Sequence, residues 1–103
     1  MQALTDAQID DLPQICPNWH ISNDRKTIEI CYKLADFPAS FGFMTEIAII
    51  CQAINHHPEW TNTYNKIWIR LSTHDIGGLS DLDIQLAQKI DKIAQKAGAS
   101  QIL

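Results

Sequence analysis

The segment spanning residues 36–55 constrains the fold most, because it predicts a long helix that is apolar on two sides. Asp36 stands at the N-cap position, and Pro38 falls in the first turn, where its missing N–H costs no hydrogen bond. Two apolar stripes follow the helical period. They comprise Phe37, Phe41, Met44, Ala48 and Cys51, and Phe43, Ile47, Ile50 and Ile54. One stripe can cover a sheet, so the other needs a neighbouring helix or another subunit.

Two pairs of strands flank this helix. Residues 19–21 and 27–34 predict the first pair, and residues 59–64 and 67–73 predict the second. In residues 67–73 apolar and polar side chains alternate with a period of two, which is typical of a half-buried antiparallel strand. Asn65-Lys66 is the expected connection in the second hairpin.

Capping boxes mark a helix near each end of the chain. Thr5 and Gln8 form the first, and the helix that they open should end near Leu12 because Pro13 follows. Ser80 and Asp83 form the second. The helix that they open has one apolar face and ends at Gly98.

The predicted order is therefore α-β-β-α-β-β-α. Hairpins separated by a long helix favour an α+β fold, a four-stranded antiparallel sheet with three helices packed on one face. A chain of 103 residues is close to the commonest domain size, so residues 1–103 are expected to form a single domain.

Charge and cysteine usage narrow the class of protein. The net charge is −4 and the 8 basic residues form no block, which argues against direct nucleic-acid binding. The 3 cysteines have no CxxC spacing and indicate reduced thiols. The N-terminus lacks the pattern of a signal peptide, and the longest apolar run, residues 47–51, is too short to span a bilayer. We expect a cytoplasmic protein with no membrane partner.

Three of the 4 histidines gather at two element ends, in Asn55-His56-His57-Pro58 and at His74. Histidine is the side chain that exchanges protons near neutral pH, so these positions are candidates for acid–base catalysis. The alternative is that His56 and His57 only terminate the helix and that His74 is an ordinary loop residue.

A metal centre is the rival to acid–base chemistry. Three histidines would suffice for a catalytic zinc ion. The chain has neither an HExxH motif nor a CxxC pair, and vicinal histidines cannot easily bind one ion together. The expected site therefore holds no metal and no cofactor.

Asp83 has two compatible interpretations. As the third residue of the last helix it would accept a hydrogen bond from the backbone N–H of Ser80. A carboxylate in that place can also orient a histidine across a cleft.

A set of motifs links these features to a known family. They are FGFMT at 41–45, NHHPEW at 55–60, YNK at 64–66, LSTH at 71–74, GLS at 78–80 and Asp83. In residue type and spacing the set resembles pterin-4a-carbinolamine dehydratase, also known as the dimerization cofactor of a hepatic nuclear factor. The resemblance covers about residues 16–95.

The resemblance implies a hydro-lyase, 4a-hydroxytetrahydrobiopterin dehydratase, which eliminates water from the 4a-hydroxy pterin and gives the quinonoid dihydropterin during tetrahydrobiopterin recycling. It implies metal-free catalysis in which His56 and His74 are the acid–base pair, His57 binds and polarises the pterin, and Asp83 orients a histidine. The implied substrate-binding residues are Asn55, His56, His57, Ser72, Thr73, His74 and Asp75.

The family likeness also implies partners. It points to a homodimer or homotetramer, which agrees with a helix that is apolar on two sides, and to a pterin as the small-molecule substrate. The alternative function is a transcriptional coactivator type of module that binds partner helices through its apolar helix face, the stripe of Phe43, Ile47, Ile50 and Ile54. One position departs from the family pattern: Gln52 stands four residues before His56, where a charged side chain is usual, so a group expected to tune His56 carries no charge.

Overall fold

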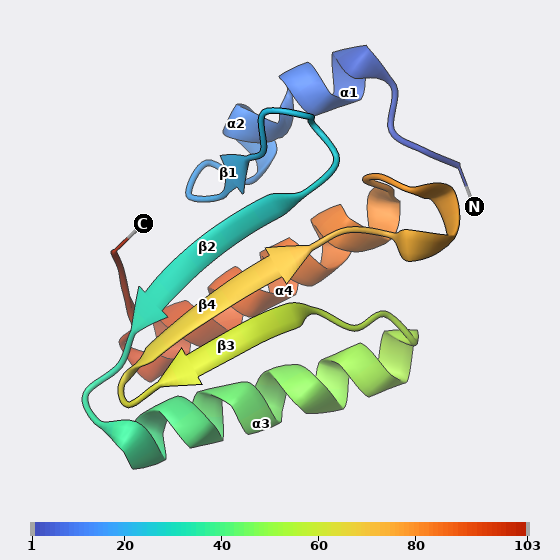
Figure 1. The fold of residues 1–103 in the computed structure, drawn as a ribbon. Helices are drawn as coiled ribbons and strands as arrows, with labels where there is room; N and C mark the ends of the chain where they lie inside the picture. Colours follow the sequence, from blue (N-terminus) through green and yellow to red (C-terminus); the bar gives the residue numbers. More distant parts are fainter. Residues whose placement is uncertain (1, 103) are drawn as a thin grey trace.

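An antiparallel sheet with helices against one face makes up the computed structural model, which describes residues 2–102 (Figure 1). The elements in chain order are α1 (Asp6–Asp10), α2 (Leu12–Ile15), β1 (His20–Ile21), β2 (Ile28–Lys33), α3 (Phe37–Ile54), β3 (Glu59–Thr63), β4 (Lys66–Leu71), the 3₁₀ helix η1 (His74–Ile76), α4 (Asp81–Ala97) and β5 (Ser100–Gln101). The predicted α+β class, with its antiparallel sheet, is confirmed.

The two hairpins join through their inner strands. The sheet order is β1-β2-β4-β3, and the long strands β2 and β4 pair over six residues, with Ile30 opposite Ile69. The short strand β5 extends the edge of β2 beside Lys33. This fifth strand was not expected, because two polar residues carry no alternating pattern. The second hairpin turns at Tyr64-Asn65, one residue earlier than predicted.

The N-terminal helix differs from the prediction. Thr5 and Gln8 do form a reciprocal capping box, but α1 ends at Asp10 and a second short helix, α2, follows. Pro13 lies in the first turn of α2, where a missing N–H breaks no intrahelical hydrogen bond. The proline therefore begins a helix and does not simply end one.

The core lies between one face of the sheet and the helices. Along β4, Ile67, Ile69 and Leu71 are fully buried, as the alternation predicted. Helix α3 buries Phe43 and Ile47 against them. Removing side chains of this size from water stabilises a fold by about 1.5–3 kcal/mol each. These contacts hold α3 against the sheet and so determine the position of its C-terminal end.

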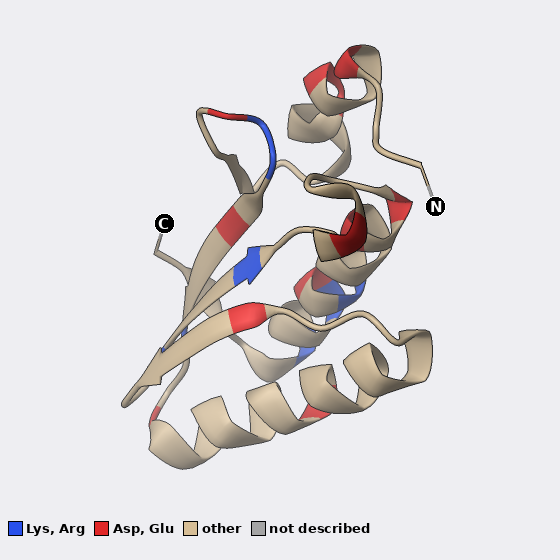
Figure 2. Cartoon of the chain, turned by 45° about the vertical axis from the view of Figure 1, so that its right-hand side comes forward, with Lys and Arg blue, Asp and Glu red and all other residues tan. Residues whose placement is uncertain are grey.

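The outer face of α3 is apolar and uncovered. Phe37, Phe41 and Ile49 are 46%, 59% and 66% exposed, and Glu46 is the one charged residue of the helix (Figure 2). By length and composition alone α3 could cross a membrane, with 18 residues, a mean hydropathy of 1.4 and only 22% of it buried. Core helices of soluble proteins can satisfy the same test. The expectation that no segment is long enough to span a bilayer rests only on the unbroken apolar run of residues 47–51.

A half-buried carboxylate ties α4 to the sheet. Asp91 accepts hydrogen bonds from Trp19 Nε1 at 2.9 Å and from the Tyr32 hydroxyl at 2.7 Å. Burial raises the pKa of Asp91 above its ordinary value, while these two donors favour its charged form. Burial and the neighbouring Asp91 raise the pKa of the Cys16 thiol to about 11, which indicates a packing residue and not a nucleophile. Anchored in this way, α4 begins at the same end of the molecule as the α3–β3 loop (Figure 1).

Candidate active site

Helix α3 ends because Asn55 adopts the left-handed conformation, with φ 53° and ψ 45°. Asparagine tolerates this backbone better than most residues with a side chain. Its N–H still donates to the carbonyl oxygens of Cys51 and Gln52, after which the chain leaves the helix axis. As a result the next two residues differ in environment: His56 is 8% exposed, whereas His57 is exposed.

Asp83 is fully buried at the start of α4 and connects three parts of the chain. Its Oδ1 lies 2.6 Å from Nε2 of His56. Its Oδ2 accepts hydrogen bonds from the Thr73 hydroxyl at 2.8 Å and from the backbone N–H of Ser80 at 2.9 Å. The same carboxylate thus contacts the N-cap and a histidine, as its two interpretations required. Because a carboxylate only accepts hydrogen bonds, His56 Nε2 is the donor in this pair.

The turn between β4 and α4 is held tightly at its base. The N–H of Thr73 donates to the carbonyl oxygen of Gly78 at 2.7 Å, and Gly77 takes a positive φ of 63°. The 3₁₀ helix η1 between them presents His74 and Asp75 to solvent. Since Thr73 reaches Asp83 and Asp83 reaches His56, the His74 turn and the His56 loop lie at one end of the molecule (Figure 1).

The comparisons with known proteins show the family to which the chain belongs. The model of the family described as pterin 4 alpha carbinolamine dehydratase matches residues 2–93. The chain belongs to this family.

Relatives within the pterin carbinolamine dehydratase family cover most of the chain. A protein of Bordetella avium, provisionally named pterin-4-alpha-carbinolamine dehydratase, is 42% identical over 82% of this chain and 78% of its own length. A Synechococcus protein with the same provisional name is 41% identical over 87% and 95%. The crystal structure of a transcriptional coactivator/pterin dehydratase from Brucella melitensis matches with a TM-score of 0.86 and 34% identity, covering 90% of this chain and 99% of that one.

Gln52, the departure from the dehydratase family pattern, lies beside a different histidine from the one expected. Its Oε1 is 3.3 Å from Nε2 of His57 and makes no hydrogen bond to His56 within residues 2–102. The expected contact between Gln52 and His56 assumed that the helix continues to His56, whereas α3 ends at Ile54. The left-handed turn at Asn55 ends that spacing, so His56 points inward to Asp83 and His57 lies back along the helix.

Among the remaining predicted residues, Thr73 hydrogen-bonds to the His56–Asp83 pair, whereas the side chains of the others make no hydrogen bond to it within residues 2–102. Ser72 is partly buried at the end of β4, and Asn55, His74 and Asp75 are exposed. Thr73, expected to line the substrate pocket, is only 6% exposed and its hydroxyl is bonded inside the protein. Within residues 2–102 no group of three or more His, Cys, Asp or Glu side chains is arranged to hold a metal ion.

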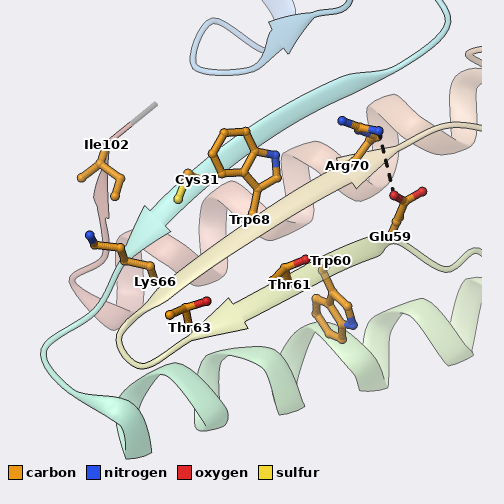
Figure 3. Close-up of a pocket in the computed structure, with 9 residues that line it drawn as sticks. All are labelled: Cys31, Glu59, Trp60, Thr61, Thr63, Lys66, Trp68, Arg70 and Ile102. Carbon is orange, nitrogen blue, oxygen red and sulfur yellow. Dashed lines mark ion pairs between the residues drawn. The ribbon is translucent and has the colours of Figure 1, made fainter.

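A separate cavity of about 600 Å³, whose lining includes no histidine, lies on the open face of the sheet (Figure 3). Sequence reasoning missed it, although the outward positions of β3 and β4 were readable from their alternation. Trp68, Lys66 and Thr61 line it, and Trp60 also belongs to its lining, with a ring that extends toward α3 (Figure 3). It contains no imidazole, so it lacks the acid–base groups of the histidine cluster.

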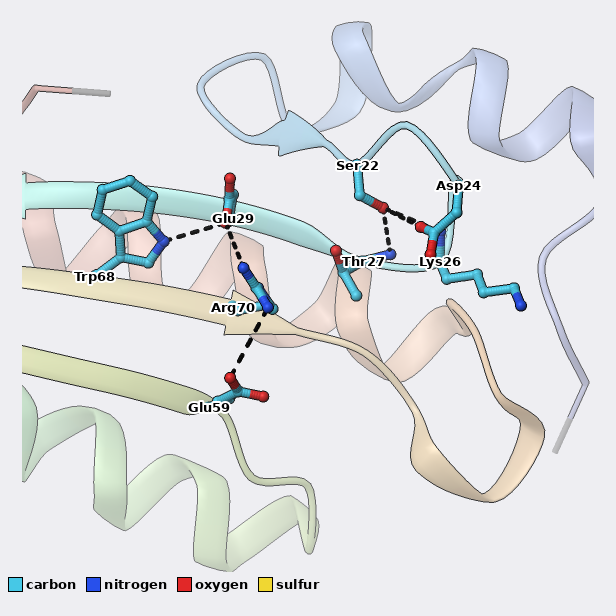
Figure 4. A network of polar contacts seen from close by, with 8 residues as sticks. All are labelled: Ser22, Asp24, Lys26, Thr27, Glu29, Glu59, Trp68 and Arg70. Atoms are coloured by element: carbon cyan, nitrogen blue, oxygen red, sulfur yellow. Dashed lines mark hydrogen bonds and ion pairs between the residues drawn. The ribbon is translucent and has the colours of Figure 1, made fainter.

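Arg70 connects the three long strands across this open face (Figure 4). Its guanidinium lies 3.4 Å from Glu29 on β2 and 3.9 Å from Glu59 on β3. The Trp68 Nε1–H donates to the same Glu29 carboxylate at 3.1 Å. Solvent-exposed ion pairs contribute at most about 1 kcal/mol each, so this cluster adds little to stability.

Proposed function

We propose that the protein eliminates water from a 4a-hydroxy-tetrahydropterin, 4a-hydroxytetrahydrobiopterin in the first instance, and releases the quinonoid dihydropterin. Family membership supports the reaction class. The observation that carries the proposal is the buried contact of 2.6 Å between His56 and Asp83, beside the turn that presents His74. The contact with Asp83 holds the His56 imidazole in place. The His74 imidazole is open to solvent.

The reaction needs two proton transfers and no electron transfer. A base removes the proton from N5, the N5–C4a bond becomes double, the C4a–O bond breaks, and an acid protonates the departing hydroxyl to give water. We assign these transfers to His56 and His74, since imidazoles can act as either acid or base near neutral pH. His56 acts through Nδ1, because its Nε2 faces Asp83. His74 is exposed and can exchange its proton with water between turnovers.

The other family-implied residues are assigned to substrate binding. His57 and Asn55 lie on the loop that follows α3, and Ser72 and Asp75 lie on the connection between β4 and α4. Their polar groups would hydrogen-bond to the heteroatoms of the pterin ring. In this assignment the chemistry requires neither a metal ion nor an organic cofactor.

A direct assay tests the proposed activity. Purified protein at micromolar concentration should accelerate formation of the quinonoid dihydropterin from a freshly generated 4a-hydroxy-tetrahydropterin, followed by its absorbance. The spontaneous rate and the rate with heat-denatured protein are the controls. A rate equal to the spontaneous one would refute the activity.

Self-association through α3 is the second part of the proposal. We propose that the uncovered face with Phe37, Phe41 and Ile49 packs against other copies in a homodimer or homotetramer. Phe41→Glu should shift the protein toward the monomer and weaken association by tenfold or more, about 1.4 kcal/mol, because a charge in an apolar interface is costly. Light scattering after gel filtration measures this shift. Lys89→Glu, at an exposed site on α4, is the control; a wild-type protein that is monomeric at high concentration contradicts the idea.

The face with Phe37, Phe41 and Ile49 favours one alternative function, whereas the stripe expected to serve it does not, because Phe43 and Ile47 are buried in the core. A module that binds partner helices would also need an uncovered apolar helix, and the Brucella melitensis protein is described as a transcriptional coactivator as well as a pterin dehydratase. If self-association protects the amides of α3 from hydrogen exchange and Phe41→Glu removes that protection, the face is occupied by copies of this chain. The interaction function then loses its structural basis.

The proposed location is the cytoplasm. Cys16, Cys31 and Cys51 are buried and free, as expected where thiols stay reduced. Recovery of the protein in the membrane or secreted fraction of fractionated cells would argue against it.

A further inference from the structure

The Thr73 hydroxyl sits between two other polar groups inside the protein. Its oxygen lies 2.7 Å from the Ser80 hydroxyl and 2.8 Å from Oδ2 of Asp83. Thr73 is 6% exposed, and Ser80 and Asp83 are fully buried. From this position the Thr73 hydroxyl can influence the site through Asp83, although it is too buried to contact a substrate readily.

The directions of these hydrogen bonds follow from proton counting. A hydroxyl has one proton to donate, and a carboxylate has none. Thr73 donates its proton to Asp83, so its oxygen accepts the proton of the Ser80 hydroxyl. The Ser80 oxygen in turn accepts the N–H of Leu82 at 3.2 Å. Every hydroxyl in the chain Leu82–Ser80–Thr73–Asp83 therefore has a fixed orientation.

This arrangement divides the two oxygens of Asp83 between two tasks. Oδ2 accepts hydrogen bonds from the Thr73 hydroxyl and the Ser80 N–H, and these two bonds prevent the carboxylate from rotating. Oδ1 remains for Nε2 of His56. Without the Thr73 hydroxyl the carboxylate would keep one of these two restraints and could rotate away from the imidazole.

We propose that Thr73 is a positioning residue for the dehydration, acting through Asp83 on His56. Its hydroxyl keeps Oδ1 opposite Nε2, which holds the proton of neutral His56 on Nε2 and leaves the lone pair of Nδ1 for the substrate. The catalytic consequence rests on the proposed function, whereas the effect on the His56 ring does not. Thr73 thereby differs from the direct pocket residue that the family likeness implied.

Two variants separate the hydroxyl from the rest of the side chain. Thr73→Val keeps the shape and removes the hydroxyl, while Thr73→Ser keeps the hydroxyl and removes a methyl group. Thr61→Val makes the same chemical change at an exposed site on β3 and is the matched control. Should Thr73→Val fail to fold, Thr73→Ala, which is smaller and also lacks the hydroxyl, takes its place.

The first readout is the pair of ¹⁵N chemical shifts of the His56 ring, which report which nitrogen carries the proton. Thr73→Val should move them away from the wild-type pattern, and Thr73→Ser and Thr61→Val should preserve it. This measurement needs no substrate, so it decides the effect of Thr73 on His56 even if the dehydratase assay is negative. Unchanged His56 shifts in Thr73→Val would overturn the proposal.

The second readout is the division between kcat and KM for the pterin. Thr73→Val should lower kcat on the order of 10-fold, the scale of one hydrogen bond to a charged group, with KM nearly unchanged. Thr73→Ser should restore most of kcat. A Thr73→Ser variant as slow as Thr73→Val, or a loss confined to KM, would assign Thr73 to packing or to substrate binding and would exclude the positioning role.

Discussion

Replacement of His74 by alanine should lower the elimination rate by about 10²–10⁴-fold, the usual contribution of a positioned acid or base. His74 is exposed at the start of η1, and within residues 2–102 its ring makes no hydrogen bond to another side chain. The loss should therefore come from chemistry and not from unfolding. Initial rates of quinonoid dihydropterin formation measure it, and circular dichroism checks that the fold is retained.

His20 supplies the matched control for this experiment. It is also an exposed histidine, but it lies on β1, outside the candidate site. His20→Ala should leave the rate unchanged within the error of the assay. Because the His74 position is open to solvent, added imidazole should restore part of the activity of His74→Ala. A His74→Ala rate within threefold of wild type would remove His74 from the proposed acid–base pair.

The features that the sequence predicts well are those determined by neighbouring residues. The alternation of β4 places Ile67 and Leu71 in the core because successive strand residues face opposite sides. The second capping box forms because Ser80 and Asp83 are three residues apart at a helix start. Both interactions are local, so one sequence is enough to recognise them.

The features that the sequence does not predict depend on distant pairing or on a change of backbone direction. Strand β5 is defined only by its contact with β2, some seventy residues earlier in the chain. Gln52 meets His57 because Asn55 leaves helical geometry, which residue spacing alone does not reveal. The hydroxyl of Thr73 could be assigned to the pocket from the family likeness, but its contacts with Ser80 and Asp83 are visible only in three dimensions.

Removal of the Asp83 carboxylate should be the most destabilising single change at the site. Asp83→Ala leaves Nε2 of His56, the Thr73 hydroxyl and the Ser80 N–H without their acceptor. Each buried donor left without an acceptor costs about 1–3 kcal/mol, so the loss of this acceptor for three donors should lower the free energy of unfolding by at least about 3 kcal/mol. Urea denaturation followed by tryptophan fluorescence measures the change.

Asp81 is the control that separates burial from helix electrostatics. It lies in the same first turn of α4 but is exposed, and its Oδ2 accepts a hydrogen bond from Gln85 at 2.6 Å. Asp81→Ala should cost about 0.3–1 kcal/mol, the contribution of an exposed acidic residue at a helix N-terminus. Asp83→Asn should fall between the two, because its amide oxygen can still cap the helix while its NH₂ group cannot accept the hydrogen bond from His56. If Asp83→Ala and Asp81→Ala destabilise equally, Asp83 acts only as a helix cap, and the restraint that it places on His56 contributes nothing to the fold.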